Sequence, residues 1–164
     1  MADKAIASIS ASISLDEIKT SIGGSLNYEP AVAISTSSGE GWVYGEHIIA
    51  YDTSHPFVHS YSDFLGDERA TDTDDLVMWI AVKNISTTAT DGICIDLAGG
   101  TPAYNLATGI FVGAGEIVVL KLGNTVTANL IARAVTMDGT YGYPSAAHTG
   151  NVTAISAAIV KNVD

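Results

Sequence analysis

Four histidines are the side chains of this sequence best suited to chemistry at neutral pH. They are His47, His55, His59 and His148. An imidazole can act as a general base or bind a metal ion, and His55 and His59 lie near Asp63 in one predicted loop. A zinc site needs further ligands at short spacing, and the sequence contains no HExxH or CxxC pattern. We therefore expect surface histidines in loops, with no metal ion and no cofactor.

Acidic residues gather in the same region of the sequence. The cluster consists of Asp67, Glu68, Asp72, Asp74 and Asp75. Carboxylate oxygens are suitable ligands for Ca²⁺, but the DxDxDG spacing with a closing Glu that marks a calcium loop is missing. We expect a solvated acidic loop.

Motifs for covalent catalysis are also missing from the sequence. It has no GxSxG nucleophile elbow and no phosphate-binding P-loop. Glu46 and Asp96 could form a carboxylate pair only if the fold brought them to one groove. The single cysteine, Cys94, is expected to be a small buried strand residue. A hydrolase on a jelly-roll fold is therefore the weakest hypothesis, and we expect no enzyme.

Aromatic residues offer one more kind of site, a platform for sugar rings. The candidates are Trp42, Tyr44, Tyr51, Trp79, Tyr141 and Tyr143. Aromatic side chains in strands also fill a sandwich core or a subunit interface, which is the interpretation we favour.

Composition narrows the class of partner. The chain has 164 residues, with 18 acidic against 7 basic side chains and a formal net charge of -11. This charge repels nucleic-acid backbones and anionic membranes, so we expect neither as a partner. Apolar residues make up 47% and charged residues 15% of the chain, which predicts some apolar surface buried against another subunit. We recognise no signal peptide and no transmembrane run.

Short apolar runs separated by Gly, Asn, Asp and Thr predict strands along most of the chain. The expected strand regions are 5–15, 18–28, 31–35, 42–51, 76–83, 93–97, 103–112, 117–122, 128–136 and 152–160. In the first, Ser alternates with Ala and Ile; in the second, Gly23-Gly24 indicates a bulge or a hairpin turn. We predict an all-β antiparallel sandwich or jelly roll of roughly ten short strands. Residues 1–30 form an N-terminal arm region and residues 31–164 the sandwich domain.

Two long loops interrupt this pattern, at 52–75 and 137–151. The first is too apolar for a free linker, because it contains Phe57, Tyr61 and Phe64. We expect it to pack on its own domain or on a neighbouring copy, with a short helical turn near Ser62–Leu65.

The region from Asp75 to Arg133 carries a pattern of strands and turns. It reads LVMWIAVKN, then ISTTATDG, ICIDLAGG and GAGEIVVLKL, followed by an Ala/Val strand. The pattern resembles small β-sandwich virion proteins of tailed bacteriophages, common in aquatic and cyanobacterial phage genomes. In that family the turn at Gly113–Glu116 is a feature of the fold, so the resemblance implies no catalytic residue.

The resemblance implies a non-enzymatic virion protein that decorates or cements the capsid as a homo-oligomer, expected to be a trimer. Its partners would be itself and the major capsid protein, on the exterior of the virion, after assembly in the host cytoplasm. Interface contacts are expected from Ile6, Ile9 and Ile13 in the arm and from Phe57, Tyr61 and Phe64 in the loop. The alternative is a tail-associated carbohydrate- or receptor-binding module.

Overall fold

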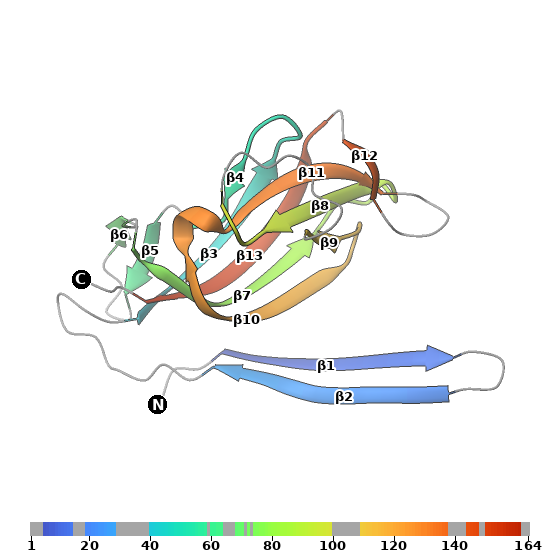
Figure 1. Cartoon of the computed structure of the whole chain (residues 1–164), viewed down its shortest axis with the longest axis horizontal. Helices are drawn as coiled ribbons and strands as arrows, with labels where there is room; N and C mark the ends of the chain where they lie inside the picture. The colour runs from blue at the N-terminus through green and yellow to red at the C-terminus, as the bar shows by residue number, and fades with distance from the viewer. Residues whose placement is uncertain are drawn as a thin grey trace. The chain divides into compact units, whose positions relative to one another are not determined.

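The computed structural model divides the chain into two compact units, Met1–Ala31 and Val32–Asp164. It describes residues 5–14, 19–28, 40–58, 60–63, 68–70, 72, 74–99, 109–137, 144–147 and 150–161. In the described residues the chain forms strands and one short 3₁₀ helix (Figure 1).

The first unit is an antiparallel hairpin of β1 (Ala5–Ser14) and β2 (Lys19–Tyr28), paired without a shift in register. Gly23 and Gly24 lie inside β2, opposite Ser10 and Ile9, so the expected bulge or turn at these glycines is wrong. The whole run from Lys19 to Tyr28 can pair because the chain already reverses before it, between Ser14 and Lys19.

The hairpin register separates apolar from polar positions, because directly paired residues share a face of an antiparallel sheet. One face carries the positions of Ala5, Ala7, Ile9, Ala11, Ile13, Thr20, Ile22, Gly24, Leu26 and Tyr28. The other carries the positions of Ile6, Ser8, Ser10, Ser12, Ser14, Lys19, Ser21, Gly23, Ser25 and Asn27. The unit is therefore amphipathic, with Ile6 on the polar face.

The second unit is a sandwich of two antiparallel sheets, as predicted (Figure 1). The six-stranded sheet has the order β10 (Ile117–Val126), β7 (Leu76–Asn84), β13 (Val152–Lys161), β3 (Glu40–Ile49), β5 (Ser60–Asp63), β6 (Glu68–Ala70). The five-stranded sheet has the order β12 (Pro144–Ala147), β11 (Ile131–Met137), β8 (Asp91–Asp96), β9 (Ile110–Val112), with β4 (His55–Pro56) paired to β11. The 3₁₀ helix η1 (Thr127–Asn129) connects β10 to β11.

Short strands replace part of the expected loops. The region 52–75 contains β4, β5 and β6, and β5 covers Ser62 and Asp63, so the expected helical turn there is wrong over those two residues. The extended pairing with β3 competes with any local turn, because Trp42 is aligned with Ser62. The expected strand at 31–35 lies outside the described residues, and of the strand expected at 103–112 the described part is β9.

An irregularity in β7 changes which of its residues face the core. Trp79 is aligned with Ile159 and Val77 with Val160, so β7 has one more residue than β13 at this point. A bulge of this kind turns the strand locally. Val77 is therefore fully buried together with Ile80, and the predicted face shared by Leu76, Met78 and Ile80 is wrong.

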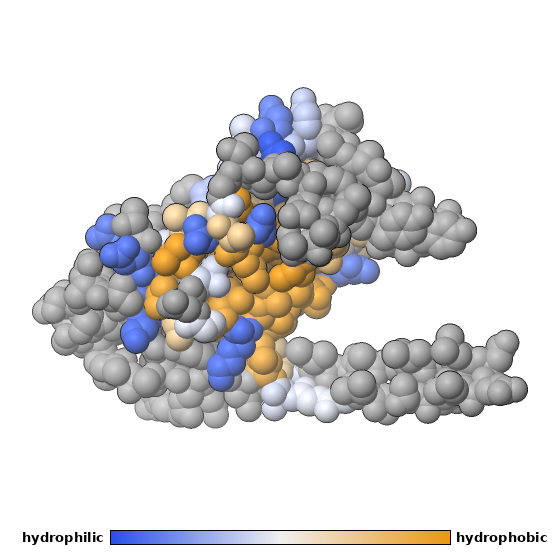
Figure 2. Space-filling model, viewed as in Figure 1, coloured by the Kyte–Doolittle hydropathy of each residue, from blue (hydrophilic) through white to orange (hydrophobic). Residues whose placement is uncertain are grey.

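The inner faces of the two sheets form one hydrophobic core, and apolar residues gather in the band between β10 and β8 (Figure 2). Its largest fully buried side chains include Phe57, Ile49, Ile80, Ile93, Ile95 and Leu130. Burying an aliphatic side chain of this size contributes about 1.5–3 kcal/mol, so this core supplies the main driving force for folding.

The Gly113–Glu116 turn joins β9 to β10. The Glu116 amide donates to the Gly113 carbonyl oxygen at 3.0 Å, and Gly115 has a φ of 75°. These features define a type II turn, in which glycine is favoured at the third position. The Glu116 side chain closes the turn, because its Oε2 accepts from the Gly113 amide at 2.7 Å.

A single buried amide ties the two sheets together at the end of β7. Asn84 Nδ2 donates to the carbonyl oxygens of Asp91 at 2.9 Å and Val112 at 3.2 Å. Its Oδ1 accepts from the Ser86 amide at 2.9 Å. The side chain therefore links β7 of one sheet to β8 and β9 of the other while its own polar atoms are satisfied.

Replacing Asn84 with Leu should destabilise the sandwich, because it leaves two carbonyl groups and one amide of the buried cluster without this partner. We expect the free energy of unfolding to fall by about 3 kcal/mol. Urea unfolding followed by tryptophan fluorescence measures the change. Thr88→Ala in the neighbouring exposed loop is the control and should change it by less than roughly 0.5 kcal/mol. Equal stability of both variants would contradict the role of Asn84.

Candidate functional site

Three side chains from three strands form a hydrogen-bonded chain inside the sandwich. His47 of β3 lies with its Nε2 2.7 Å from Ser156 Oγ of β13. Its Nδ1 lies 3.0 Å from Nε2 of His55 in β4. We call these three residues the histidine chain.

The strand register positions the histidine chain. Ala154 and Ser156 of β13 are aligned with His47 and Gly45 of β3, which puts the hydroxyl one row away from the His47 ring on the inner face. β4 pairs with β11 through His55 and Ala132. The contact between the two histidines therefore joins the six-stranded sheet to the five-stranded sheet.

Phe57 packs against both imidazoles. Its ring lies 5.3 Å from that of His47 and 6.3 Å from that of His55, with interplanar angles of 84° in both cases. Edge-to-face contacts of this kind are favourable and hold the rings in place. Phe57 is 1% exposed, which corrects the expected subunit contact: this side chain fills the core of its own sandwich.

The order of groups in the histidine chain is that of a hydroxyl, a base and a group that orients the base. Serine hydrolases use such an order to activate a nucleophile. Here Ser156 is 2% and His47 8% exposed, so a substrate carbonyl has no path to the hydroxyl in this structure. The histidine chain thus meets the hydrogen-bonding requirement of a hydrolase without the access that the reaction needs.

Proton occupancy limits what the two histidines can do. A bond between His47 Nδ1 and His55 Nε2 needs one proton between the two nitrogens. A second proton would place two N–H donors against each other at 3.0 Å. The contact therefore suits every state of the pair except the one in which both rings are charged.

Two of the four histidines differ from the predicted surface positions in loops. His47 is in a strand and buried, and His55 is half-buried, so these two are not surface histidines of loops. His59 and His148 lie outside the described residues. The alternation of β3 could have placed His47 inward, between Val43 and Ile49, but no local signal marks Ser156 as its partner.

Glu46 and Asp96 do not share a groove. Glu46 is exposed on the outer face of the six-stranded sheet. Asp96 lies at the end of β8 in the other sheet, where the alternation puts Ile95 in the core, and its Oδ1 accepts from the Ala98 amide at 2.8 Å. The two carboxylates are therefore on opposite outer faces, and a paired acid and base is excluded.

The acidic cluster contains one buried member. Asp75 is 1% exposed, and its Oδ2 accepts from the Asp72 amide at 2.8 Å, while Asp72 and Asp74 are exposed. Asp67 and the side chain of Glu68 lie outside the description. Among the residues that are described, no group of three His, Cys, Asp or Glu could hold a metal ion.

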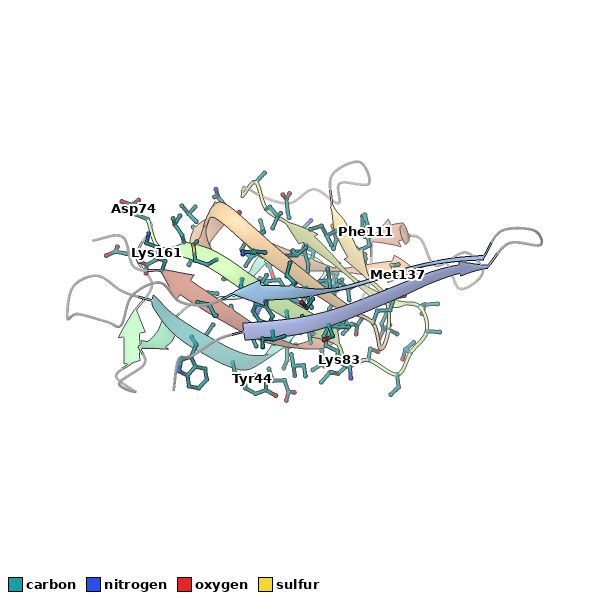
Figure 3. The ribbon with its side chains drawn as sticks, turned by 90° about the horizontal axis from the view of Figure 1, so that it is seen from below. Tyr44, Asp74, Lys83, Phe111, Met137 and Lys161 are labelled. Atoms are coloured by element: carbon teal, nitrogen blue, oxygen red, sulfur yellow. The ribbon has the colours of Figure 1, made fainter. Side chains whose placement is uncertain are left out.

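The candidate aromatic platform divides into exposed and buried members. Trp42, Tyr44 and Tyr51 are exposed, whereas Trp79 is 8% exposed. Tyr141 and Tyr143 lie outside the described residues. Trp42 and Tyr44 belong to the outer face of β3, and Tyr44 projects away from the sheet (Figure 3).

The other residues expected to make contacts belong to the arm and to the loop at 52–75. Ile6 is 54% exposed, and Ile9 and Ile13 occupy positions on the apolar face of the hairpin. Tyr61 is aligned with Arg69 in the β5–β6 pair, and Phe64 lies outside the described residues. Cys94 is buried in β8, as predicted.

Within the described part of the chain, no helix is long and apolar enough to span a membrane.

Removing the contact between the two imidazoles should destabilise the sandwich. His55→Leu takes away the ring nitrogen that lies 3.0 Å from His47 Nδ1, and we expect the free energy of unfolding to fall by about 1–3 kcal/mol. Urea unfolding followed by tryptophan fluorescence measures the change.

The matched variant for this experiment is His55→Gln, which keeps a side chain able to form a hydrogen bond with His47. It should lower the free energy of unfolding by less than His55→Leu. Equal losses for the two variants would contradict the proposed role of the pair.

No family model, curated protein or solved structure matches this chain.

Proposed function

We propose that the protein is a non-enzymatic structural protein of a tailed-bacteriophage particle. It decorates the head shell as a homo-oligomer, for which we propose a trimer, and binds the major capsid protein on the outside of the particle. The expected strand and turn pattern supports this proposal, since the resemblance extends over β7, β8, β9 and β10 and their turns.

The observation that carries the proposal is the amphipathic hairpin. A two-stranded hairpin is at best marginally stable alone in water. The hairpin of residues 5–28 forms a separate compact unit, and its register gathers the apolar positions on one face. An arm of this kind is suited to bind a surface supplied during assembly, because its apolar face is then removed from water.

Multivalency explains how weak contacts could hold such a protein on a shell. A closed oligomer presents several copies of one surface to a lattice of repeated sites. Once one copy is bound, the others bind at a high effective concentration, so the overall affinity exceeds that of any single copy.

The charge of the chain fits a location outside the shell. At a formal net charge of -11, the protein would be repelled by packaged nucleic acid. The same charge keeps the solvent-facing surface of a decorated particle soluble.

Residues on the two faces of β1 provide a matched test. The double variant Ile9→Lys, Ile13→Lys places two charges on the apolar face, and Ser8→Lys, Ser12→Lys places the same charges on the polar face. Because burying an isoleucine contributes about 1.5–3 kcal/mol, the first variant should bind at least roughly tenfold more weakly and the second should bind normally. Cosedimentation with heads of the encoding phage that lack the protein measures binding.

Circular dichroism should show that both variants remain folded. Equal binding of the two variants would exclude a role of the apolar arm face in head binding. Failure of the unmodified protein to bind heads would overturn the proposed function itself.

A carbohydrate- or receptor-binding module in the tail is the second candidate, favoured by Trp42 and Tyr44. These two rings are exposed on one strand face and are two residues apart, or about 7 Å. Aromatic faces at this spacing can pack against successive sugar rings. A glycan array compares the unmodified protein with Trp42→Ala, and a signal that Trp42→Ala abolishes would support this candidate over the shell protein.

A further inference from the structure

The outer face of the six-stranded sheet is unusually apolar. On β3 the outward residues are Trp42, Tyr44, Glu46 and Ile48, of which Trp42 is 47%, Tyr44 64% and Ile48 65% exposed. An antiparallel sheet normally presents polar side chains on the face that meets water. We call Trp42, Tyr44 and Ile48 the β3 stripe. Large exposed apolar patches of this kind mark interaction sites.

The neighbouring strands extend this apolar character. The register aligns Ala157 of β13 with Tyr44 and with Ala81 of β7, and Val119 of β10 with Ala81. Charged residues also lie on this face: Glu46 on β3, Lys161 on β13, Lys83 on β7 and Lys121 on β10. The row formed by Tyr44, Ala157, Ala81 and Val119 contains no charge and is therefore its most apolar part.

The β3 stripe leaves three large side chains in contact with water, Trp42, Tyr44 and Ile48. The homo-oligomer proposed above offers a second copy of the chain as their cover. A second copy of the chain supplies another apolar surface, the apolar face of its hairpin. A two-stranded hairpin is at best marginally stable alone in water, so contact with the stripe would also stabilise the hairpin.

Size and shape favour the hairpin as the occupant. β1 and β3 each contain ten residues, which corresponds to about 33 Å of strand. In the middle of the apolar hairpin face each small position is aligned with a large one: Ala7 with Leu26, Gly24 with Ile9 and Ala11 with Ile22. Small residues allow the bulky side chains of the stripe to approach the hairpin backbone closely, so the two faces can interdigitate.

We propose that the β3 stripe of one copy binds the apolar face of the hairpin of a second copy. This inference rests on the homo-oligomeric part of the proposed function and assigns its contact surface. Each copy gives one hairpin and receives another, so the contact is head-to-tail and closes into a ring when the rotation between copies permits.

Single-cysteine variants test which chains meet. Tyr44→Cys labels the stripe, Ala11→Cys labels the apolar face of the hairpin, and Ser10→Cys labels its polar face as the matched control. Equal amounts of Tyr44→Cys and Ala11→Cys protein are mixed, allowed to exchange subunits and mildly oxidised. The cross-linked peptides are then identified by mass spectrometry.

We expect a disulfide between residues 44 and 11 of different chains, at least roughly tenfold more abundant than with Ser10→Cys, because docking raises the effective concentration of the two thiols. The buried Cys94 is present in every sample, and the unmodified protein shows the background. The inference is overturned if mixed chains give no excess over the control. It is also overturned if a Tyr44→Cys, Ala11→Cys double variant cross-links only within one chain.

A second measurement separates this inference from the proposed function. Tyr44→Lys changes an exposed side chain and should leave the sandwich folded, while the mass in solution by light scattering should fall from that of the oligomer to that of one chain. An unchanged oligomer mass would overturn the inference. Head binding by the unmodified protein is scored independently, so loss of either result leaves the other interpretable.

Discussion

The register of β13 between β3 and β7 is the constraint on which the rest of the sandwich depends. Val152, Ala154, Ser156, Ala158 and Val160 are all buried on its inner face, while Thr153, Ile155, Ala157 and Ile159 belong to the outer face. A shift by one residue would exchange these two sets. The buried core, the contact of Ser156 with His47 and the apolar outer face would then all be lost together.

This register also places two polar contacts in one row. Ala154 is aligned with His47 on one side and with Asn84 on the other, and both of these buried side chains reach groups attached to the opposite sheet. Buried polar groups destabilise a fold unless their hydrogen bonds are made, and here they are made across the core. The two contacts specify how the sheets align, which apolar packing alone does less sharply.

The inner and outer faces of the six-stranded sheet differ in what they can do. The inner face contains the imidazole and hydroxyl groups that could take part in a reaction, but the packing that orders these groups also buries them. The outer face has few polar groups near β3 and leaves large side chains in contact with water. Recognition of another macromolecule uses a surface of the second kind, and the hairpin, a separate compact unit, has an apolar face as well.

Period-two alternation was enough to predict the all-β class and most of the long strands, because these depend on local propensity and on one face being dry. The glycines at 113 and 115 were enough to predict the turn before β10. The alternation of Ser with Ala and Ile likewise predicted an amphipathic first strand. The position of Met78 as an extra residue, the burial of Phe57 and the meeting of His47 with His55 and Ser156 were decided by tertiary structure. Ser156 is 109 residues from His47 along the chain, and only the pairing of β13 with β3 brings them together. Local sequence reports which face of a strand is apolar, whereas contacts between distant strands depend on a register that both strands and the opposite sheet select jointly.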